Sequence, residues 1–236
     1  MLKYIYGLDS FERHRAVANL LKMSLQLPAT VLDVGGEISI RCNHLGRFVK
    51  GYSITTANVG RASDVSYDGD TLPFGDKSFD AVVSIDTAEH VPKEKRMAWI
   101  QGFFRVSRKI VLLAAPLGTE FNRNHDRAMN ELHRSMFGAD HHYLKEHIAC
   151  GLPELEEIRS WAGGRPYKLF FEGDARIGRN NMTTLFRLQK SAGPFKTPMK
   201  LLHQLYTLRD YRPLKFESEP NQYTKRWYLL VGWDRE

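Results

Sequence analysis

Cysteines and long apolar runs are scarce in the 236-residue sequence, and each scarcity excludes a class of protein. The two cysteines, Cys42 and Cys150, are too few for a framework of disulfides and are typical of a reducing compartment, although the two thiols could pair. No segment approaches the roughly 18 apolar residues of a membrane span, and the N-terminus lacks the apolar core of a signal peptide. We therefore expect a cytoplasmic protein without a transmembrane segment.

Dense basic runs are also missing, although the formal net charge is +7. Lys and Arg exceed Asp and Glu by 15 to 12 over residues 1–118 and by 19 to 15 over residues 119–236, so the excess is spread along the chain. A nucleic-acid groove would instead concentrate Lys and Arg with interleaved aromatic residues. We therefore expect no nucleic-acid partner.

The apolar residues that are present form short runs that predict strands. Most of these runs lack strict apolar–polar alternation, as expected for strands that are covered on both faces. They occupy residues 31–34, 48–54, 65–67, 79–85 and 110–114. Helical patterns at residues 39–45 and 93–106 fall between them, and another helix is expected from Ser10 to Pro28. This order predicts βαβ units and hence a parallel sheet.

The chain after residue 116 begins with a long polar stretch and then returns to regular patterns. The segment "GLPELEEIRSWAGG" predicts a helix that ends at its glycines, and "YKLFFEGD" and "RWYLLVGWD" predict two further strands. Two helices are predicted between those strands, at residues 181–189 and 199–209. Four leucines of the second helix are expected to form a packing stripe rather than a membrane or partner surface. They are Leu201, Leu202, Leu205 and Leu208.

The stretch "VLDVGGEISI", residues 31–40, places an acid and two glycines at the end of the first predicted strand. Ligands of such sheets bind outside the carboxyl ends of the strands, and Gly35 and Gly36 leave room for close approach. Glu37 follows where a helix is expected to begin, and its carboxylate would repel the pyrophosphate of NAD or FAD. A cationic ligand without phosphates fits better. S-adenosylmethionine, with its sulfonium and ammonium groups, is such a ligand.

Three segments resemble the motifs of the class I S-adenosylmethionine-dependent methyltransferases. They are "VLDVGGE", "YDGDTLPFGDKSFDAVVSIDTAEHVP" and "KIVLLAAP", and the second contains the "LPF" and "SFD" of the type 11-like branch. The resemblance implies an α/β fold with a Rossmann-like, seven-stranded, mostly parallel sheet, helices on both faces and an antiparallel last strand. We expect one domain over residues 1–236, with a helical insertion before the last strand. Residues 29–116 would form the cofactor-binding half, and residues 117–236 the substrate-binding segments and closing strands.

The same resemblance implies S-adenosylmethionine as the cofactor. The family's glycine turn falls on Asp33 and Gly35, whereas Glu37 and Ser39 stand where the family has further glycines. Gly36 supplies backbone freedom from the adjacent position. We therefore expect the turn to bind the cofactor in spite of its altered pattern.

Other cofactor contacts are implied at the ends of later strands. The family has an acid after the second strand that binds the ribose, but "SITTAN" contains none, and neutral side chains would have to replace it. The candidates are Thr55, Thr56 and Asn58. Near the adenine the resemblance places Asp68, with Gly69 and Asp70 beside it, and it places Asp86 near the methionine and the reacting methyl. Asp33 could instead only cap its turn, and Asp68 and Asp70 could be ordinary turn residues before Pro73.

Histidines are concentrated after the fifth predicted strand, in "NRNHDRAMNELHRSMFGADHHYLKEHIACGLP". The many Arg, Asn and His side chains suit an acceptor with hydroxyls or carboxylates, such as a sugar. "HHYLKEH" followed by "GLP" is similar to a motif of methyltransferases associated with surface-polysaccharide assembly. That resemblance implies a glycan acceptor, with His142, Glu146 or His147 near the transferred methyl.

The expected catalytic group is a base that removes a hydroxyl proton. On a helix, His142 and Glu146 lie on one face at i, i+4, so the carboxylate could orient the imidazole. His147, His90 in "EHVP" and Asp86 are the other candidates. A divalent metal held by His141, His142, Glu146 and His147 is conceivable but is not predicted, and the histidines could also be merely exposed or cap helices.

The leading hypothesis is an O-methyltransferase that acts on a saccharide, a glycan-linked acceptor or another small molecule. Three rivals stay open: an RNA or protein methyltransferase, a catalytically retired methyltransferase fold that serves as a binding subunit, and an NAD-dependent sugar-modifying enzyme. The altered glycine turn and the missing ribose acid favour the second rival. The sequence leaves the oligomeric state open.

Overall fold

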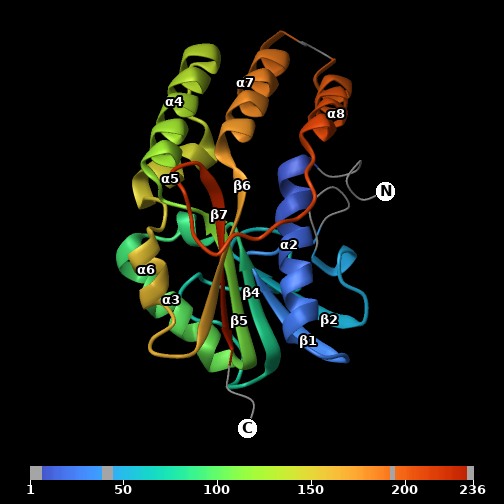
Figure 1. Cartoon of the computed structure of the whole chain (residues 1–236), viewed down its shortest axis with the longest axis vertical. Coiled ribbons are helices and arrows are strands. Elements are labelled where there is room, and N and C mark those ends of the chain that lie inside the picture. The colour runs from blue at the N-terminus through green and yellow to red at the C-terminus, as the bar shows by residue number, and fades with distance from the viewer. Residues whose placement is uncertain (1–6, 39–44, 192–194, 233–236) are drawn as a thin grey trace.

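A computed structural model describes residues 7–38, 45–191 and 195–232 and arranges them around one seven-stranded sheet (Figure 1). The strands lie in the order β3-β2-β1-β4-β5-β7-β6. Their bounds are β1 (Ala29–Val34), β2 (Tyr52–Asn58), β3 (Val65–Ser66), β4 (Phe79–Ile85), β5 (Ser107–Pro116), β6 (Tyr167–Asp174) and β7 (Thr224–Gly232).

Strands β1 to β5 pair in parallel, and β7 runs antiparallel to both β5 and β6. The predicted Rossmann-like sheet with an antiparallel last strand is therefore confirmed. Because parallel strands end at the same edge, the residues that follow β1, β2, β4 and β5 meet there. This carboxyl edge is where ligands bind in open α/β sheets.

Seven α-helices belong to the described part of the chain, together with three short 3₁₀ turns. The helices are α2 (Leu8–Ser24), α3 (Lys93–Val106), α4 (Glu120–Phe137), α5 (His142–Cys150), α6 (Leu155–Ser160), α7 (Ala175–Ser191) and α8 (Lys196–Thr207). The 3₁₀ turns are η1 (Leu45–Arg47), η2 (Ala88–His90) and η4 (Leu208–Asp210). The predicted helical insertion before the last strand is confirmed as α7 and α8.

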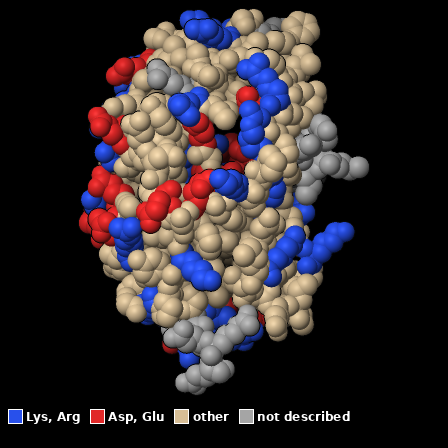
Figure 2. Space-filling model, in the orientation of Figure 1, with Lys and Arg blue, Asp and Glu red and all other residues tan. Residues whose placement is uncertain are grey.

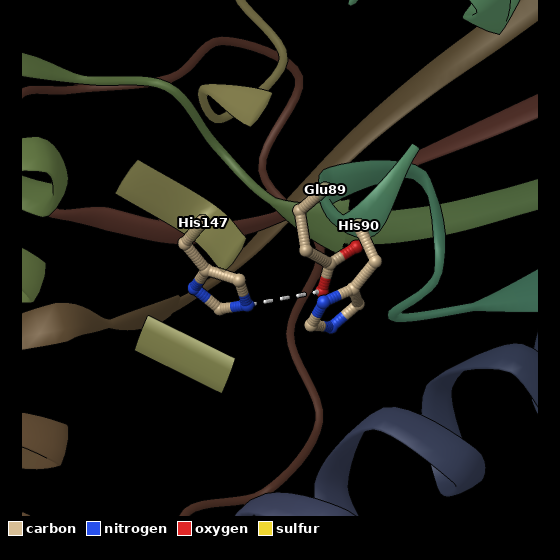
Figure 3. Close-up of side chains that lie close together, drawn as sticks. All are labelled: Glu89, His90 and His147. Carbon is tan, nitrogen blue, oxygen red and sulfur yellow. Dashed lines mark ion pairs between the residues drawn. The ribbon is translucent and has the colours of Figure 1, made fainter. Parts of the chain in front are cut away.

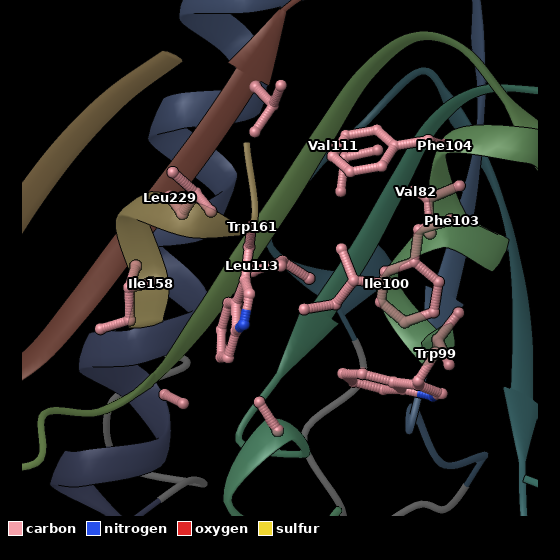
Figure 4. Packing of buried hydrophobic residues seen from close by; sticks show 14 of the residues in the cluster. Val82, Trp99, Ile100, Phe103, Phe104, Val111, Leu113, Ile158, Trp161 and Leu229 are labelled. Carbon is pink, nitrogen blue, oxygen red and sulfur yellow. The ribbon is translucent and has the colours of Figure 1, made fainter. Parts of the chain in front are cut away.

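Hydrophobic side chains cover both faces of the sheet. On one face, the aromatic side of α3, with Trp99 and Phe103, packs with Trp161 against the central strands (Figure 4). On the other face, α2 inserts Val17 and Leu21 among strand residues of the second core cluster. Burial on both faces explains why β1, β4 and β5 read as nearly continuous apolar runs.

Predicted and observed elements agree where the hydrophobic pattern is strong, as in β4 and α3. The second strand was predicted at residues 48–54, but β2 begins at Tyr52 and ends at Asn58. The apolar signal at Phe48 and Val49 comes from a loop that packs into the α2 side of the core, and the polar end of β2 is held by Asp64. The helix predicted at residues 39–45 lies almost entirely outside the described residues.

Helix α4 was not predicted, because the 18-residue segment is mostly polar. The Thr119 side chain accepts the N–H of Asn122 at 3.1 Å and caps the start of the helix, and Gly138, with φ 78°, ends it. Helices α4, α7 and α8 rise beyond the carboxyl edge of the sheet in Figure 1. With α5 they form what we call the helical cap, and Met129, Leu144 and Phe186 pack together inside it.

The prediction that four leucines of α8 form a packing stripe is wrong. Leu201, Leu202 and Leu205 are 52%, 58% and 44% exposed. The helix instead turns His203 and Thr207 inward, and the His203 ring bonds to the carbonyl of Asn181 in α7 at 2.9 Å. Among the described residues no helix has the length and apolar character needed to cross a membrane.

Candidate active site

A cleft of about 1710 Å³ lies at the carboxyl edge of the sheet, between α2 and the helical cap. Figure 2 shows a hollow on this face, with acidic atoms inside it and Lys and Arg side chains around it. Residues that follow β1 and β4 line the cleft together with residues of α2 and α5. The segments that the sequence singled out for cofactor and acceptor therefore share one cavity.

The glycine turn after β1 has no room for side chains. Gly35 has φ +89°, and a Cβ there would lie 2.1 Å from Oγ1 of Thr87. A Cβ on Gly36 would lie 2.5 Å from Oδ2 of Asp33. Asn58 at the end of β2 donates to the carbonyls of Gly35 and Gly36, at 2.7 and 3.1 Å, and so fixes the turn.

Two acids flank this turn in different environments. Asp33 is 3% exposed, and burial raises the pKa of its carboxyl to about 7. Glu37 forms an ion pair with Arg61, which also donates to the Tyr143 hydroxyl of α5. The guanidinium offsets the charge of Glu37, so this carboxylate repels a pyrophosphate less than the sequence alone suggests. The expected helix after it lies outside the described residues.

The three candidates for binding the ribose differ in their position relative to the cleft. The described residues that line the cleft include Asn58 but neither Thr55 nor Thr56. Thr56 is buried against Asp64, whose Oδ2 accepts its N–H at 2.7 Å and its hydroxyl at 2.9 Å. Thr55 and Thr56 lie outside the lining because β2 continues to Asn58, which is three residues beyond Thr55 and two beyond Thr56.

The predicted adenine acids lie in the cleft lining. Asp68, Gly69 and Asp70 all contribute to it. Oδ1 of Asp68 accepts the N–H groups of Asp70 and Thr71, both at 2.9 Å, and these bonds lower the pKa of the Asp68 carboxyl. Asp68 therefore also shapes its turn, as the alternative interpretation stated, while its role toward a cofactor stays a prediction.

Asp86, at the end of β4, is held between two arginines. Arg226 of β7 donates to both of its oxygens, through Nε at 3.0 Å and Nη2 at 2.7 Å, and Arg13 of α2 donates to the same carboxylate. Burial opposes ionisation, but the two guanidinium groups hold the pKa of Asp86 below its usual value. A carboxylate stabilised in this way is a poor base, so Asp86 does not suit the reserve catalytic role considered from the sequence.

The histidines gather beside η2, where α5 packs against it. Nδ1 of His90 lies 2.7 Å from Oε2 of Glu146, and Nδ1 of His147 lies 2.9 Å from Oδ2 of Asp126. The rings of His90 and His147 are 4.9 Å apart between centroids. Burial disfavours a charged ring, yet the bond to Asp126 and the nearby Glu89 hold the pKa of His147 above its usual value.

Glu89 was missed in the sequence. It is 1% exposed, and its Oε1 lies 4.0 Å from Nε2 of His147 (Figure 3). Among the described residues its Oε2 has no hydrogen-bond partner. Burial, and after it the charge of Asp86, raise the pKa of the Glu89 carboxyl to about 8. The only available signal was its position beside His90 in "EHVP", because burial of a carboxyl does not show in a sequence.

The i, i+4 pair of His142 and Glu146 forms, with Nε2 of His142 3.3 Å from Oε1 of Glu146. However, the His142 side chain is 73% exposed, so the pair lies at the mouth of the cleft. Glu146 reaches inward with its other oxygen to His90. His147 is the more enclosed of the two predicted α5 histidines.

Comparisons with known proteins agree with this architecture. A family model described as a methyltransferase domain matches residues 32–114, which is less than half of the chain. A sequence search of curated proteins finds no match. Similar folds occur in solved structures of low identity, which show the fold alone.

Three of these structures cover most of the chain. A protein described as a putative sarcosine dimethylglycine methyltransferase from Galdieria sulphuraria has a TM-score of 0.56 at 17% identity, covering 94% of this chain and 84% of that one. The plantazolicin methyltransferase BpumL, in complex with SAH, has a TM-score of 0.54 at 10% identity, covering 95% of this chain and 84% of that one. The YcgJ protein of Bacillus subtilis has a TM-score of 0.52 at 16% identity, covering 94% of this chain and 99% of that one. The chain thus has the class I methyltransferase fold.

Proposed function

We propose that the protein is an S-adenosylmethionine-dependent methyltransferase that transfers a methyl group to a hydroxyl of a saccharide or glycan-linked acceptor. The observation that carries the proposal is one cleft that joins a side-chain-free glycine turn after β1 to a buried cluster of histidines and carboxylates after β4. The family match over residues 32–114 supports the reaction class.

The cofactor half of the cleft suits a cationic ligand. Asp33 is buried beside the turn, and Asp68 and Asp70 lie on the adjoining loop. A sulfonium or ammonium group near Asp33 would stabilise its carboxylate, which burial alone disfavours. The sheet order also differs from that of the dinucleotide-binding fold, in which the strands run 3-2-1-4-5-6 without an antiparallel insertion.

The acceptor half is polar. His90, His125 and His147, together with Asp126 and Glu146, line the cleft where the helical cap closes over it. The polar atoms that these side chains do not pair with one another can hydrogen-bond a ligand with several hydroxyls, whereas a flat apolar ring would leave such atoms without a partner at a cost of about 1–3 kcal/mol for each buried group. This contrast supports a saccharide over an apolar acceptor.

Methyl transfer to a hydroxyl needs alignment and the loss of one proton. The acceptor oxygen bonds to the methyl carbon while the carbon–sulfur bond breaks, and the sulfur keeps the electron pair of that bond. His147 is placed to take the hydroxyl proton. Its Nδ1–H donates to Asp126, which leaves the lone pair on Nε2, directed toward the buried Glu89.

Calorimetry with S-adenosylhomocysteine and NAD is the first test. We expect S-adenosylhomocysteine to bind with micromolar-range affinity and NAD to bind at least about tenfold more weakly, which corresponds to 1.4 kcal/mol. Radioactive methyl transfer from S-adenosylmethionine to a panel of oligosaccharides then tests the reaction. Tight NAD binding without S-adenosylhomocysteine binding would refute the cofactor assignment. Cofactor binding without transfer to any saccharide, small molecule, protein or RNA acceptor would favour a retired binding subunit.

Alanine at His147 and alanine at His142 should have different effects. We expect His147→Ala to lower turnover by about 10² to 10⁴, because a positioned histidine base contributes that range. His142→Ala should lower it by less than about tenfold, because its ring is largely exposed. Single-turnover rates at saturating cofactor make the comparison, and calorimetry checks that cofactor affinity is retained. Equal effects in both variants would remove the special role of His147.

A further inference from the structure

The geometry points to a divalent transition-metal site formed by Glu89, His90 and His147. One potential ligand atom from each of these residues lies within 4.8 Å of the others. Ligands of a metal such as Zn²⁺ at about 2.0–2.2 Å from the ion are themselves separated by roughly 3 to 4 Å. Small rotations of the three side chains therefore suffice to close a site around an ion. Figure 3 shows the three side chains converging from η2 and α5.

The two imidazoles are held as metal-binding histidines usually are. Each ring places Nδ1 against a carboxylate, His90 on Glu146 at 2.7 Å and His147 on Asp126 at 2.9 Å. Such a bond fixes the tautomer and makes the other ring nitrogen a better ligand. Two separate carboxylate–histidine pairs that meet at one point are not needed for a single proton-transfer base.

Glu89 supplies an independent observation. Its carboxyl is 1% exposed, and in the part of the chain that the structure describes its Oε2 has no hydrogen-bond partner. A buried polar atom without a partner costs about 1–3 kcal/mol, and more if it is charged, so such an atom calls for an explanation. A cation bound between Glu89 and the two histidines would contact Oε1, the oxygen nearer to His147, and bidentate binding of the carboxylate would bring Oε2 to the same ion.

The charge balance also favours a cation. Glu89, Asp126 and Glu146 place three carboxyl groups around the histidines, and in the described part of the chain their side-chain partners are histidines only. The nearby Asp86 is already paired with Arg13 and Arg226. The set of two nitrogens and one oxygen suits Zn²⁺, Co²⁺, Fe²⁺ or Mn²⁺ better than Mg²⁺, which prefers oxygen ligands only.

The use of the ion in catalysis rests on the proposed function, although its binding does not. Three protein ligands leave coordination positions open, and an acceptor hydroxyl could occupy one of them. The ion would then lower the pKa of that hydroxyl and orient it toward the methyl group, and the released proton would pass to water. In this metal-assisted version of the reaction, His147 acts as a metal ligand instead of a base. The metal set differs from the His141, His142, Glu146 and His147 group considered from the sequence.

Cobalt titration of the full-length, metal-stripped protein tests the site without cofactor or acceptor. We expect one Co²⁺ per chain, with visible absorption bands of a nitrogen- and oxygen-ligated ion, and displacement by Zn²⁺ but not by equimolar Mg²⁺. Glu89→Gln and His147→Ala should weaken binding by more than about 100-fold. Asp126→Ala should weaken it by about 10- to 100-fold, because it removes a partner of a ligand.

His133→Ala is the matched control, since this histidine lies outside the cleft lining and bonds to the carbonyl of Ala139. It should bind Co²⁺ as the wild type does, and thermal unfolding verifies that each variant is folded. The site is refuted if the wild type binds no Co²⁺ stoichiometrically, or if His133→Ala weakens binding as much as His147→Ala. Failure of methyl transfer with intact Co²⁺ binding would overturn the proposed function and leave the site standing.

Discussion

Replacing Asp86 with alanine should lower the free energy of unfolding by about 3 to 5 kcal/mol, the usual cost of breaking a buried ion pair. Arg226 is 2% exposed, and its charge depends on Asp86 at 3.0 and 2.7 Å and on Asp9 at 3.4 Å. The variant would leave this guanidinium buried with one distant carboxylate. Arg13 would lose the same partner, so the contact between α2 and β7 would weaken.

Urea unfolding measures this change, and Asp70→Ala provides the control. Asp70 also forms an ion pair, with Lys95 at 3.3 Å, but both side chains are largely exposed. Exposed pairs contribute about 0 to 1 kcal/mol, so this variant should change stability little. Similar losses in both variants would mean that the Asp86 network is not structural. If the expected difference is found, loss of activity in Asp86→Ala is no evidence that Asp86 acts as a base.

The fold was predictable where apolar residues repeat with a clear period. The bounds of strand β4 and helix α3 were predicted to the residue, because burial on both faces gives β4 a nearly continuous apolar run and because α3 carries one aromatic stripe. Helix α4 was missed because its inward face carries Asn122, Asp126 and Asn130. The stripe on α8 was misinterpreted, because an apolar face of a helix shows only that it could pack, not that a partner is present.

The site was predictable in position but not in pairing. The turn after β1 and the acid and histidine after β4 lie in the lining of the cleft, as expected for a sheet that binds ligands at its carboxyl edge, while their roles stay a prediction. The partners of Asp86 could not be found, since Arg226 lies 140 residues away in the chain and reaches it only through strand β7. The ion pair between Glu37 and Arg61 was likewise not visible in the sequence. Arg61 offsets the negative charge of Glu37, and the sequence-based argument against NAD depended on that charge.

Two acids near the end of β4 illustrate how position decides chemistry. Asp86 and Glu89 are three residues apart and both are largely buried, but Asp86 is surrounded by guanidinium groups and Glu89 by histidines. The first carboxyl is therefore kept charged and joins elements of the fold. The second lies beside the histidines and has one oxygen without a hydrogen-bond partner among residues 7–38, 45–191 and 195–232. A sequence shows two equivalent acids, and only the folded chain separates their roles.

Asp33 should stabilise the folded apoprotein at low pH, and this contribution should be lost as the pH rises from about 4 to about 7, whereas Asp33→Asn should lack it. Burial raises the pKa of Asp33 to about 7 in the folded state, against about 3.9 in an unfolded chain. The folded state therefore binds the proton more tightly. The stabilising contribution is full below pH 4 and is lost as the pH rises through 7. The difference of about 3 pH units corresponds to up to about 4 kcal/mol.

The difference between the unfolding free energies of wild type and Asp33→Asn isolates this group, because Glu12 and Glu89 also have raised pKa values and titrate in both proteins. Between pH 4 and pH 8 the unfolding free energy of Asp33→Asn should rise relative to that of the wild type. The ammonium group of S-adenosylhomocysteine beside Asp33 should lower this pKa again. Because Asp33 is about half protonated at pH 7, binding at that pH should release up to about half a proton. Calorimetry in buffers of different ionisation enthalpy detects this proton in the wild type, and none is expected for Asp33→Asn. A parallel pH dependence of stability in the two proteins would show that Asp33 is ionised in the folded chain throughout this range.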